Sequence, residues 1–163
     1  MSGKPLKVTV TGTSESQTKL AVSARHFSFV IDEPVSFGGA DTGPNPVEYA
    51  LASLAGCMNV VIHMVAQERG VQVRALRLTV TGELDTSRLM DLPTENRAGF
   101  QGIDLIAEID SDSSAADLDD VLRLSALRCP VSDNLSHATP ITVHLAAPSE
   151  RTAVEVGRPT VGA

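Results

Sequence analysis

Two cysteines, Cys57 and Cys129, are the side chains of this sequence best suited to nucleophilic or redox chemistry. Cys57 ends the apolar stretch GPNPVEYALASLAGC, and Cys129 directly precedes PVSDNLSH, a segment able to form a helical turn whose backbone N–H groups face the sulfur. A helix N-terminus lowers the pKa of a thiol and favours the reactive thiolate. A free cysteine is, however, most often a small residue buried in the core. The pattern therefore predicts either a redox pair or two cysteines that only pack.

A reactive thiolate also needs a cation, and two arginines are placed to supply one. Arg25 precedes His26 between two predicted strands, and Arg128 is the immediate neighbour of Cys129. Either arginine is equally well explained as a solvated surface residue, so sequence position alone does not choose between these roles.

Glu48 is the one acid of the apolar stretch. Asn45 suits the N-cap of a helix, Pro46 its first position and Glu48 its third, which is the pattern of a capping box. In one straight helix, the nine steps from Glu48 to Cys57 place the two on roughly opposite faces, about 13 Å apart along the axis. A joint role in chemistry therefore requires a bridging residue or a second subunit, as a twofold dimer would provide.

Composition narrows the classes of ligand. The 163 residues carry a formal net charge of -7 and 3% aromatic residues, which argues against nucleic-acid binding. The sequence has no Cys-x-x-Cys or His-x-x-x-His spacing, no Gly-rich phosphate loop and no dinucleotide fingerprint. We therefore expect no metal and no cofactor, and small molecules or proteins as partners. The four histidines are scattered: His26, His63, His137 and His144.

The pattern of hydrophobic residues predicts one α+β domain over residues 1–147 and a mobile tail over 148–163. The start of the chain lacks the apolar core of a signal peptide, so we expect a cytoplasmic protein with reduced thiols and no membrane segment. The long helix is expected to be a buried central one, enclosed rather than laid on a surface, because its apolar residues cover more than one face. Predicted strands cover 6–12, 19–24, 26–31, 76–84, 103–109 and 141–146, and predicted helices cover 46–69 and 115–128.

Two separated motifs, in this order, resemble the OsmC/Ohr family of organic hydroperoxide resistance proteins, and its OsmC-like branch most of all. The resemblance extends over about residues 25–145. The segments that carry it are Asp32-Glu33-Pro34, Gly38-Gly39, TGPNPVEYALASLAGC from Thr42 to Cys57, and Cys129-Pro130-Val131-Ser132.

This resemblance implies an α+β fold in which antiparallel sheets surround two central helices of an intertwined homodimer, with active sites at the subunit interface. It also implies a cysteine-based peroxidase, in which Cys57 is oxidised by an organic hydroperoxide and Cys129 resolves the product as a disulfide. Arg25 matches the family's arginine, and the reductant is expected to be an external dithiol, typically a lipoylated protein. Leu54, Met58 and Phe37 are expected to line the pocket.

The sequence departs from the family at the catalytic glutamate. Counting from Asn45-Pro46, that position holds Val47, and Glu48 comes one residue later, so Glu48 is either catalytic or only a cap. Two alternative functions stay open. The protein could be a dimeric small-molecule binding or sensing protein with little peroxidase turnover, or a cysteine hydrolase or acyl-transfer enzyme with Cys57 as nucleophile and a histidine as base.

Overall fold

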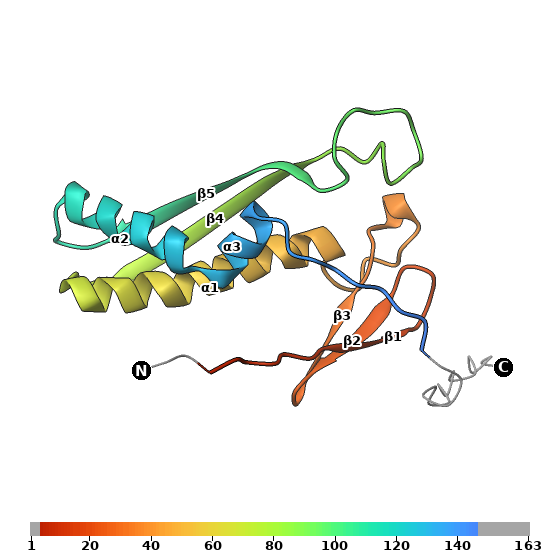
Figure 1. The fold of residues 1–163 in the computed structure, drawn as a ribbon, viewed down its shortest axis with the longest axis horizontal. Helices are drawn as coiled ribbons and strands as arrows, with labels where there is room; N and C mark the ends of the chain where they lie inside the picture. Colours follow the sequence, from red (N-terminus) through yellow and green to blue (C-terminus); the bar gives the residue numbers. More distant parts are fainter. Residues whose placement is uncertain (1–3, 147–163) are drawn as a thin grey trace. The chain divides into compact units, whose positions relative to one another are not determined.

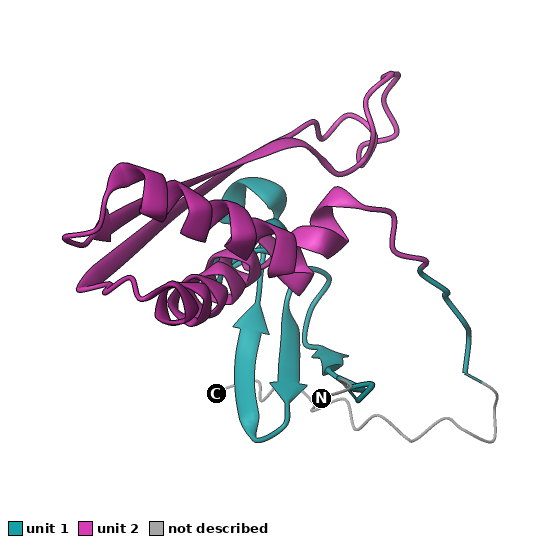
Figure 2. Cartoon of the chain, turned by 60° about the vertical axis from the view of Figure 1, so that its left-hand side comes forward, with its two compact units in different colours: residues 1–48, 141–163 teal, residues 49–140 magenta. Residues whose placement is uncertain are grey.

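The computed structural model describes residues 4–146, which form an α+β fold with two antiparallel sheets (Figure 1). The chain divides into two compact units, one containing the described residues up to Glu48 and those from Ile141 onwards, the other 49–140 (Figure 2). The single domain predicted over 1–147 stays a prediction, and the predicted tail lies outside the described residues. The elements are β1 (Thr11–Ser14), β2 (Leu20–Ala24), β3 (Phe27–Ile31), the 3-10 helix η1 (Val35–Phe37), α1 (Pro46–Arg69), β4 (Ala75–Leu84), β5 (Phe100–Asp110), α2 (Ala115–Arg128) and α3 (Pro130–Ser136).

The first unit is built on an antiparallel sheet of order β1-β2-β3. In its register Val22 pairs with Gly12 on one side and with Phe29 on the other. The two strands predicted over 19–24 and 26–31 are confirmed. The break between them is a tight turn at Arg25, whose backbone φ of 57° lies in the left-handed region.

Two predicted strands of this unit differ in the structure. The first begins at Thr11 rather than at residue 6, and the strand predicted over 141–146 is absent. In these segments Leu6, Val8, Ile141 and Val143 alternate with polar residues as in a strand, but all four are exposed. Alternation becomes a strand only when backbone N–H and C=O groups find a ladder partner, and no such partner is seen among the described residues of this one chain.

Buried Asp32 anchors the loop that leads to the long helix. Its carboxylate accepts hydrogen bonds from the backbone N–H groups of Glu33, Ala40 and Thr42 and from the Thr42 hydroxyl at 2.8 Å. Burial acts to raise the pKa of Asp32, but these hydrogen bonds outweigh it and the pKa is lowered. Gly39 is required in this loop because a Cβ there would lie 1.7 Å from the Glu33 carbonyl oxygen.

The second unit packs helices against a long antiparallel hairpin of β4 and β5. In the register Leu78 pairs with Ala107 and Val80 with Leu105, and side chains alternate between a half-buried inner face and an exposed outer face. This is the period of a strand with one covered face, and it confirms both predicted strands, although β5 begins three residues earlier than expected. The centre of the core consists of Ile62, Val65, Val121 and Cys129, each at most 1% exposed.

Helix α1 has the predicted bounds. It begins with a capping box, in which Glu48 N–H donates to Asn45 Oδ1 at 2.9 Å and Asn45 N–H donates to Glu48 Oε2 at 2.8 Å. It is followed by Gly70, whose φ of 70° permits the left-handed turn that ends a helix. Beyond the turn, Arg128 at the end of α2 pairs with Glu68 of α1 through two hydrogen bonds of 2.5 and 3.0 Å.

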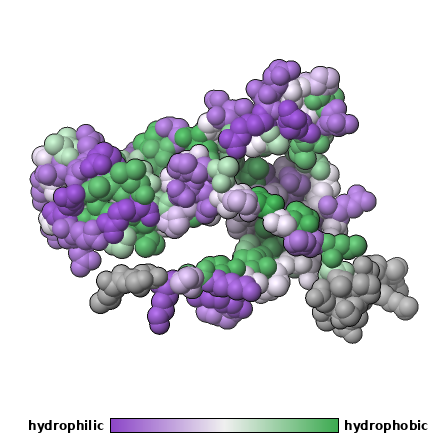
Figure 3. Space-filling model, viewed as in Figure 1, coloured by the Kyte–Doolittle hydropathy of each residue, from purple (hydrophilic) through white to green (hydrophobic). Residues whose placement is uncertain are grey.

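The enclosure expected for α1 is only partial in the single chain. One face, which includes Leu54, Met58 and Ile62, is buried, while Val60 and Met64 are 63% and 41% exposed. Within its unit, the hairpin and α2 supply cover for one side only. Helix α1 is also long and apolar enough to cross a membrane, a property that core helices of soluble proteins share. Apolar side chains show among polar ones on the surface (Figure 3).

Candidate functional site: a pair of thiols beside an apolar pocket

The second unit brings the two cysteines together. Cys57 is half-buried on α1, whereas Cys129 is 1% exposed between α2 and α3, and both are free thiols. Cys57 packs against the buried cluster that contains Cys129, and the interaction between the two thiols is one of the causes that raise the pKa of Cys129. Neither residue could have been paired with the other from its spacing, because the contact depends on how α1 packs against the turn after α2.

Proline chemistry explains the position of Cys129. Because Pro130 disfavours helical geometry in the residue before it, α2 ends at Arg128 and Cys129 is extended, with φ -79° and ψ 112°. The chain then re-enters a helix, with Pro130 at its first position and Cys129 as its N-cap. The Cys129 sulfur accepts a hydrogen bond from Ser132 N–H at 3.4 Å, which confirms the predicted turn with N–H groups facing the sulfur.

The protonation of Cys129 follows from competing effects. Burial raises its pKa, and the interaction with Cys57 raises it further, against the lowering effect of the N–H groups of Ser132 and Val131. Cys129 therefore keeps its proton at neutral pH, although the turn alone favours the thiolate.

Glu48 lies at the start of the helix that carries Cys57. Its carboxylate caps Asn45 N–H, and the helix is continuous from Pro46 to Arg69. The nine steps from Glu48 to Cys57 therefore separate the two along the axis and place them on opposite faces, as the sequence predicts. The observed role of Glu48 is that of a helix cap, and a catalytic role stays a prediction.

The two candidate cations have different surroundings. Arg25 is exposed at the β2–β3 turn of the first unit, where its guanidinium carbon lies 5.1 Å from the centre of the Phe27 ring. Its pairing with Cys57 stays a prediction, because the two residues belong to different units. Arg128 is engaged by Glu68, which lowers the pKa of that carboxyl through a hydrogen bond, so it is held away from a role as thiolate partner.

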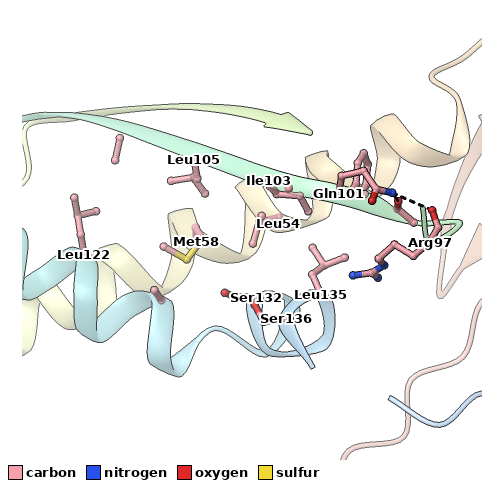
Figure 4. Close-up of a pocket in the computed structure, with 15 residues that line it drawn as sticks. Leu54, Met58, Arg97, Gln101, Ile103, Leu105, Leu122, Ser132, Leu135 and Ser136 are labelled. Carbon is pink, nitrogen blue, oxygen red and sulfur yellow. Dashed lines mark hydrogen bonds between the residues drawn. The ribbon is translucent and has the colours of Figure 1, made fainter. Parts of the chain in front are cut away.

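A pocket of about 570 Å³, lined mostly by apolar residues, lies within the second unit (Figure 4). It borders the site through Met58, which follows Cys57 in α1, and through Ser132, whose N–H reaches Cys129. Leu54 and Met58 line it as expected, but Phe37 belongs to η1 in the other unit and does not. The other lining residues are Arg97, Gly99, Phe100, Gln101, Gly102, Ile103, Leu105, Ala107, Leu122, Ala126, Leu135 and Ser136.

Sequence reasoning missed the polar end of this pocket. Arg97 comes from the connection between β4 and β5, which the sequence pattern predicts only as a polar segment between two strands. No motif marks Arg97, and only the fold of the loop turns it toward the apolar lining. Histidines do not line this pocket, and the described residues contain no group of three or more side chains able to hold a metal ion.

The fold and the site define an α+β protein with a thiol pair beside an apolar pocket. The sequence matches the family described as OsmC-like protein over residues 38–144, and the chain therefore belongs to the OsmC-like family. No curated protein matches the sequence.

Solved structures share this fold. An OsmC-like protein from Mycoplasma pneumoniae has a TM-score of 0.72 at 22% identity, with 82% of this chain and 89% of that chain covered. An organic hydroperoxide resistance protein OsmC from Legionella pneumophila has a TM-score of 0.63 at 18% identity, covering 82% and 91%. One from Elizabethkingia anophelis has a TM-score of 0.56 at 17% identity, covering 80% and 88%. At these identities the likeness concerns the fold, and it confirms the OsmC-like fold class expected from the motifs.

Proposed function

We propose that this protein is a thiol-dependent peroxidase that reduces organic hydroperoxides to alcohols. The observation that carries the proposal is that two free thiols lie together, with Cys57 packed against the buried cluster that contains Cys129, near a pocket lined mostly by apolar residues. A lone buried cysteine is explained by packing alone. Two free thiols that lie close together can instead be oxidised to a disulfide, and reduced again, with little movement of the chain. Family membership supports the proposal, since the family includes peroxidases and two of the similar structures are organic hydroperoxide resistance proteins.

The roles of the two cysteines follow from their surroundings. Cys57 is the less buried of the two sulfurs, whereas Cys129 is enclosed and its raised pKa keeps it protonated. As a thiolate, Cys57 attacks an oxygen of the hydroperoxide, the O–O bond breaks, and the leaving alkoxide takes a proton to become the alcohol. Cys57 is thereby oxidised to a sulfenic acid while the hydroperoxide is reduced.

The second step joins the two sulfurs. The Cys129 sulfur attacks the sulfenic sulfur of Cys57, an S–S bond forms, and the sulfenic oxygen leaves as water with the Cys129 proton. An external dithiol then reduces the disulfide by thiol exchange, and is itself oxidised to a disulfide while both cysteines regain their protons. A lipoyl group is the dithiol expected from the family, and no described residue of this chain specifies that choice.

We further propose that the active form is a cytoplasmic homodimer in which Arg25 supplies the positive charge beside the Cys57 thiolate. The exposed apolar residues Val60 and Met64 on α1, and the exposed alternating segments 6–10 and 141–145, are surfaces that a second copy would cover. A second chain would cover the face of α1 that is exposed in one chain.

Mass spectrometry after one equivalent of cumene hydroperoxide tests the peroxidase directly. We expect a loss of two hydrogens that links the Cys57 and Cys129 peptides, reversed by an added dithiol. A Cys129→Ser protein should instead trap the sulfenic acid, detectable with dimedone. Unmodified thiols in both proteins, with intact peroxide, would overturn the proposal.

One observation favours a second candidate, a dimeric small-molecule binding or sensing protein with little turnover. Val47 stands where the family's catalytic glutamate is expected, and Glu48 is occupied as a cap. This candidate predicts a ligand-induced rise in melting temperature without oxidation of the thiols. For the hydrolase alternative, the hydrogen bonds of His63 and His137 go to backbone carbonyls of their own helices rather than to either thiol.

A further inference from the structure

The pocket beside the thiols is charged at one end only. Among the described residues that line it, Arg97 is the single charged side chain, and the others are apolar, glycine, serine or glutamine. Figure 4 shows the Arg97 guanidinium at one end, directed toward Leu135 rather than away from the lining. In the part of the chain that the structure describes, Arg97 forms no ion pair, whereas Arg74 and Arg128 are each paired with carboxylates.

The loop that carries Arg97 is held in place on both sides. Before Arg97, the Asp85 carboxylate accepts hydrogen bonds from Ser87 N–H, from the Thr94 hydroxyl at 3.0 Å and from Asn96 Nδ2 at 2.7 Å. These donors hold the pKa of Asp85 far below its usual range, so the carboxylate stays an acceptor at physiological pH.

After Arg97, one side chain pins the backbone. Gln101 Nε2 donates to the carbonyl oxygens of Arg97 and Gly99, each at 2.9 Å. Gly99 leaves room for the guanidinium, since a Cβ at this position would lie 3.1 Å from Arg97 Nη2. A cation whose backbone is fixed on both sides and whose charge is uncompensated is prepared for an anion from outside the chain.

The pocket runs from this cation toward the thiols. Gln101, Ile103, Leu105 and Ala107 follow one another on the pocket side of β5, a span of roughly 20 Å at the rise of a strand. Beyond Arg97 and Gln101 the lining is mostly apolar with two serines, Ser132 and Ser136, and it reaches Met58 and Ser132, which are close in sequence to the two cysteines. The site thus suits a molecule with an acid group at one end and an aliphatic chain that extends toward the sulfurs.

We propose that Arg97 is a specificity-determining residue that binds the carboxylate of an aliphatic acid, so that the pocket selects acidic over neutral aliphatic molecules. Arg97 presents a planar fork of N–H donors that matches a carboxylate. The chain carries a formal net charge of -7 and repels anions in general, so this local cation decides whether an acid enters. That the acid carries a hydroperoxide group rests on the proposed peroxidase function.

Calorimetry on the reduced full-length protein tests the binding without any peroxide. The probes are decanoate and decanol, which share the aliphatic chain and differ in charge. We expect decanoate to bind more tightly by about tenfold to a hundredfold, the range of a charge-assisted hydrogen bond. Equal affinities for decanoate and decanol would overturn the inference without any variant.

Variants assign this preference to one side chain. Arg97→Gln should abolish the preference for decanoate, and Arg97→Lys should restore part of it, because the charge returns without the fork. Arg77→Gln is the matched control, since Arg77 is an 80% exposed arginine on the outer face of β4 and lies outside the pocket. An Arg97→Gln protein that still prefers decanoate as the parent does would assign the anion site elsewhere.

A kinetic comparison extends the test to the reaction. The substrates are an aliphatic hydroperoxy acid and its methyl ester, and the readout is the ratio of their kcat/KM values. This ratio should fall by about tenfold or more in Arg97→Gln and stay at the parental value in Arg77→Gln. Absence of turnover with both substrates, with the calorimetric preference intact, would refute the peroxidase but leave the acid site standing. A ratio unchanged in Arg97→Gln would refute the acid site alone.

Discussion

Cys57 packs against the buried cluster that contains Cys129, although one cysteine lies within α1 and the other in the turn between α2 and α3. This contact makes the two sulfurs unequal. Burial and the interaction with Cys57 raise the pKa of Cys129 and keep it protonated, whereas Cys57 is the more accessible sulfur. The order of events in the proposed reaction follows from that inequality, with Cys57 oxidised first and Cys129 as the resolving thiol.

Replacing each cysteine should therefore give different defects. Cys57→Ser should reduce the consumption of cumene hydroperoxide to the rate without enzyme, because a serine hydroxyl is not ionised at neutral pH. Cys129→Ser should release one equivalent of alcohol per protein and then stop at the sulfenic acid. A peroxide-consumption assay with and without added dithiol distinguishes the two. Parental turnover in Cys57→Ser would refute the assignment of the nucleophile.

The raised pKa of Cys129 predicts a pH dependence of stability. The folded protein holds this proton more tightly than the unfolded chain, so the contribution to stability is present in full below the unfolded thiol pKa of roughly 8.5 and is lost as the pH rises through the raised value. Urea unfolding of the reduced protein should show a smaller free energy of unfolding at high pH than at neutral pH. Cys129→Ala should have a weaker alkaline loss, and an equal loss in both proteins would contradict the shift.

Glu48 can be tested as a cap and as a catalyst with separate variants. Glu48→Gln preserves a capping box and should keep the free energy of unfolding within about 0.5 kcal/mol of the parent. Asn45→Ala removes the reciprocal partner and should cost about 1 kcal/mol. Thermal unfolding measures both. A large loss of peroxide turnover in Glu48→Gln, at unchanged stability, would show that the carboxylate takes part in the chemistry as well.

The homodimer predicts the effect of a charge on the open face of α1. Val60→Glu should shift the protein from dimer to monomer, because a carboxylate on an apolar contact surface loses its solvation without a partner. Size-exclusion chromatography with light scattering measures the mass. Leu127→Glu is the control, since Leu127 is a 72% exposed residue on α2, and it should leave the mass unchanged. A monomeric parent would refute the dimer.

Local elements were the most predictable part of the fold. The bounds of α1 and α2 agree with the sequence pattern because caps and breakers mark their ends: Asn45 and Gly70 for α1, and the Cys129-Pro130 dipeptide for α2. Strand prediction failed where pairing is not local. Residues 6–10 and 141–146 alternate correctly but have no ladder in the described chain, and a period of two cannot reveal whether a partner strand exists.

The candidate site was predictable only in part. The motifs around Cys57 and Cys129 identified both thiols, but the contact between them and the protonation of Cys129 depend on packing and burial. Arg97 had no motif at all, because its orientation comes from the hydrogen bonds of Asp85 and Gln101 to the loop around it.

By itself, the sequence determined which residues carry the chemistry and where the helices begin and end, because thiols, caps and prolines act through their own chemistry and their nearest neighbours. Only the tertiary structure decided which groups meet: the packing of Cys57 against the cluster that contains Cys129, the capping contact that occupies Glu48, and the cation at the end of the pocket. The physical reason is that burial and hydrogen bonding between distant segments arise from packing of whole elements, and no local pattern records it.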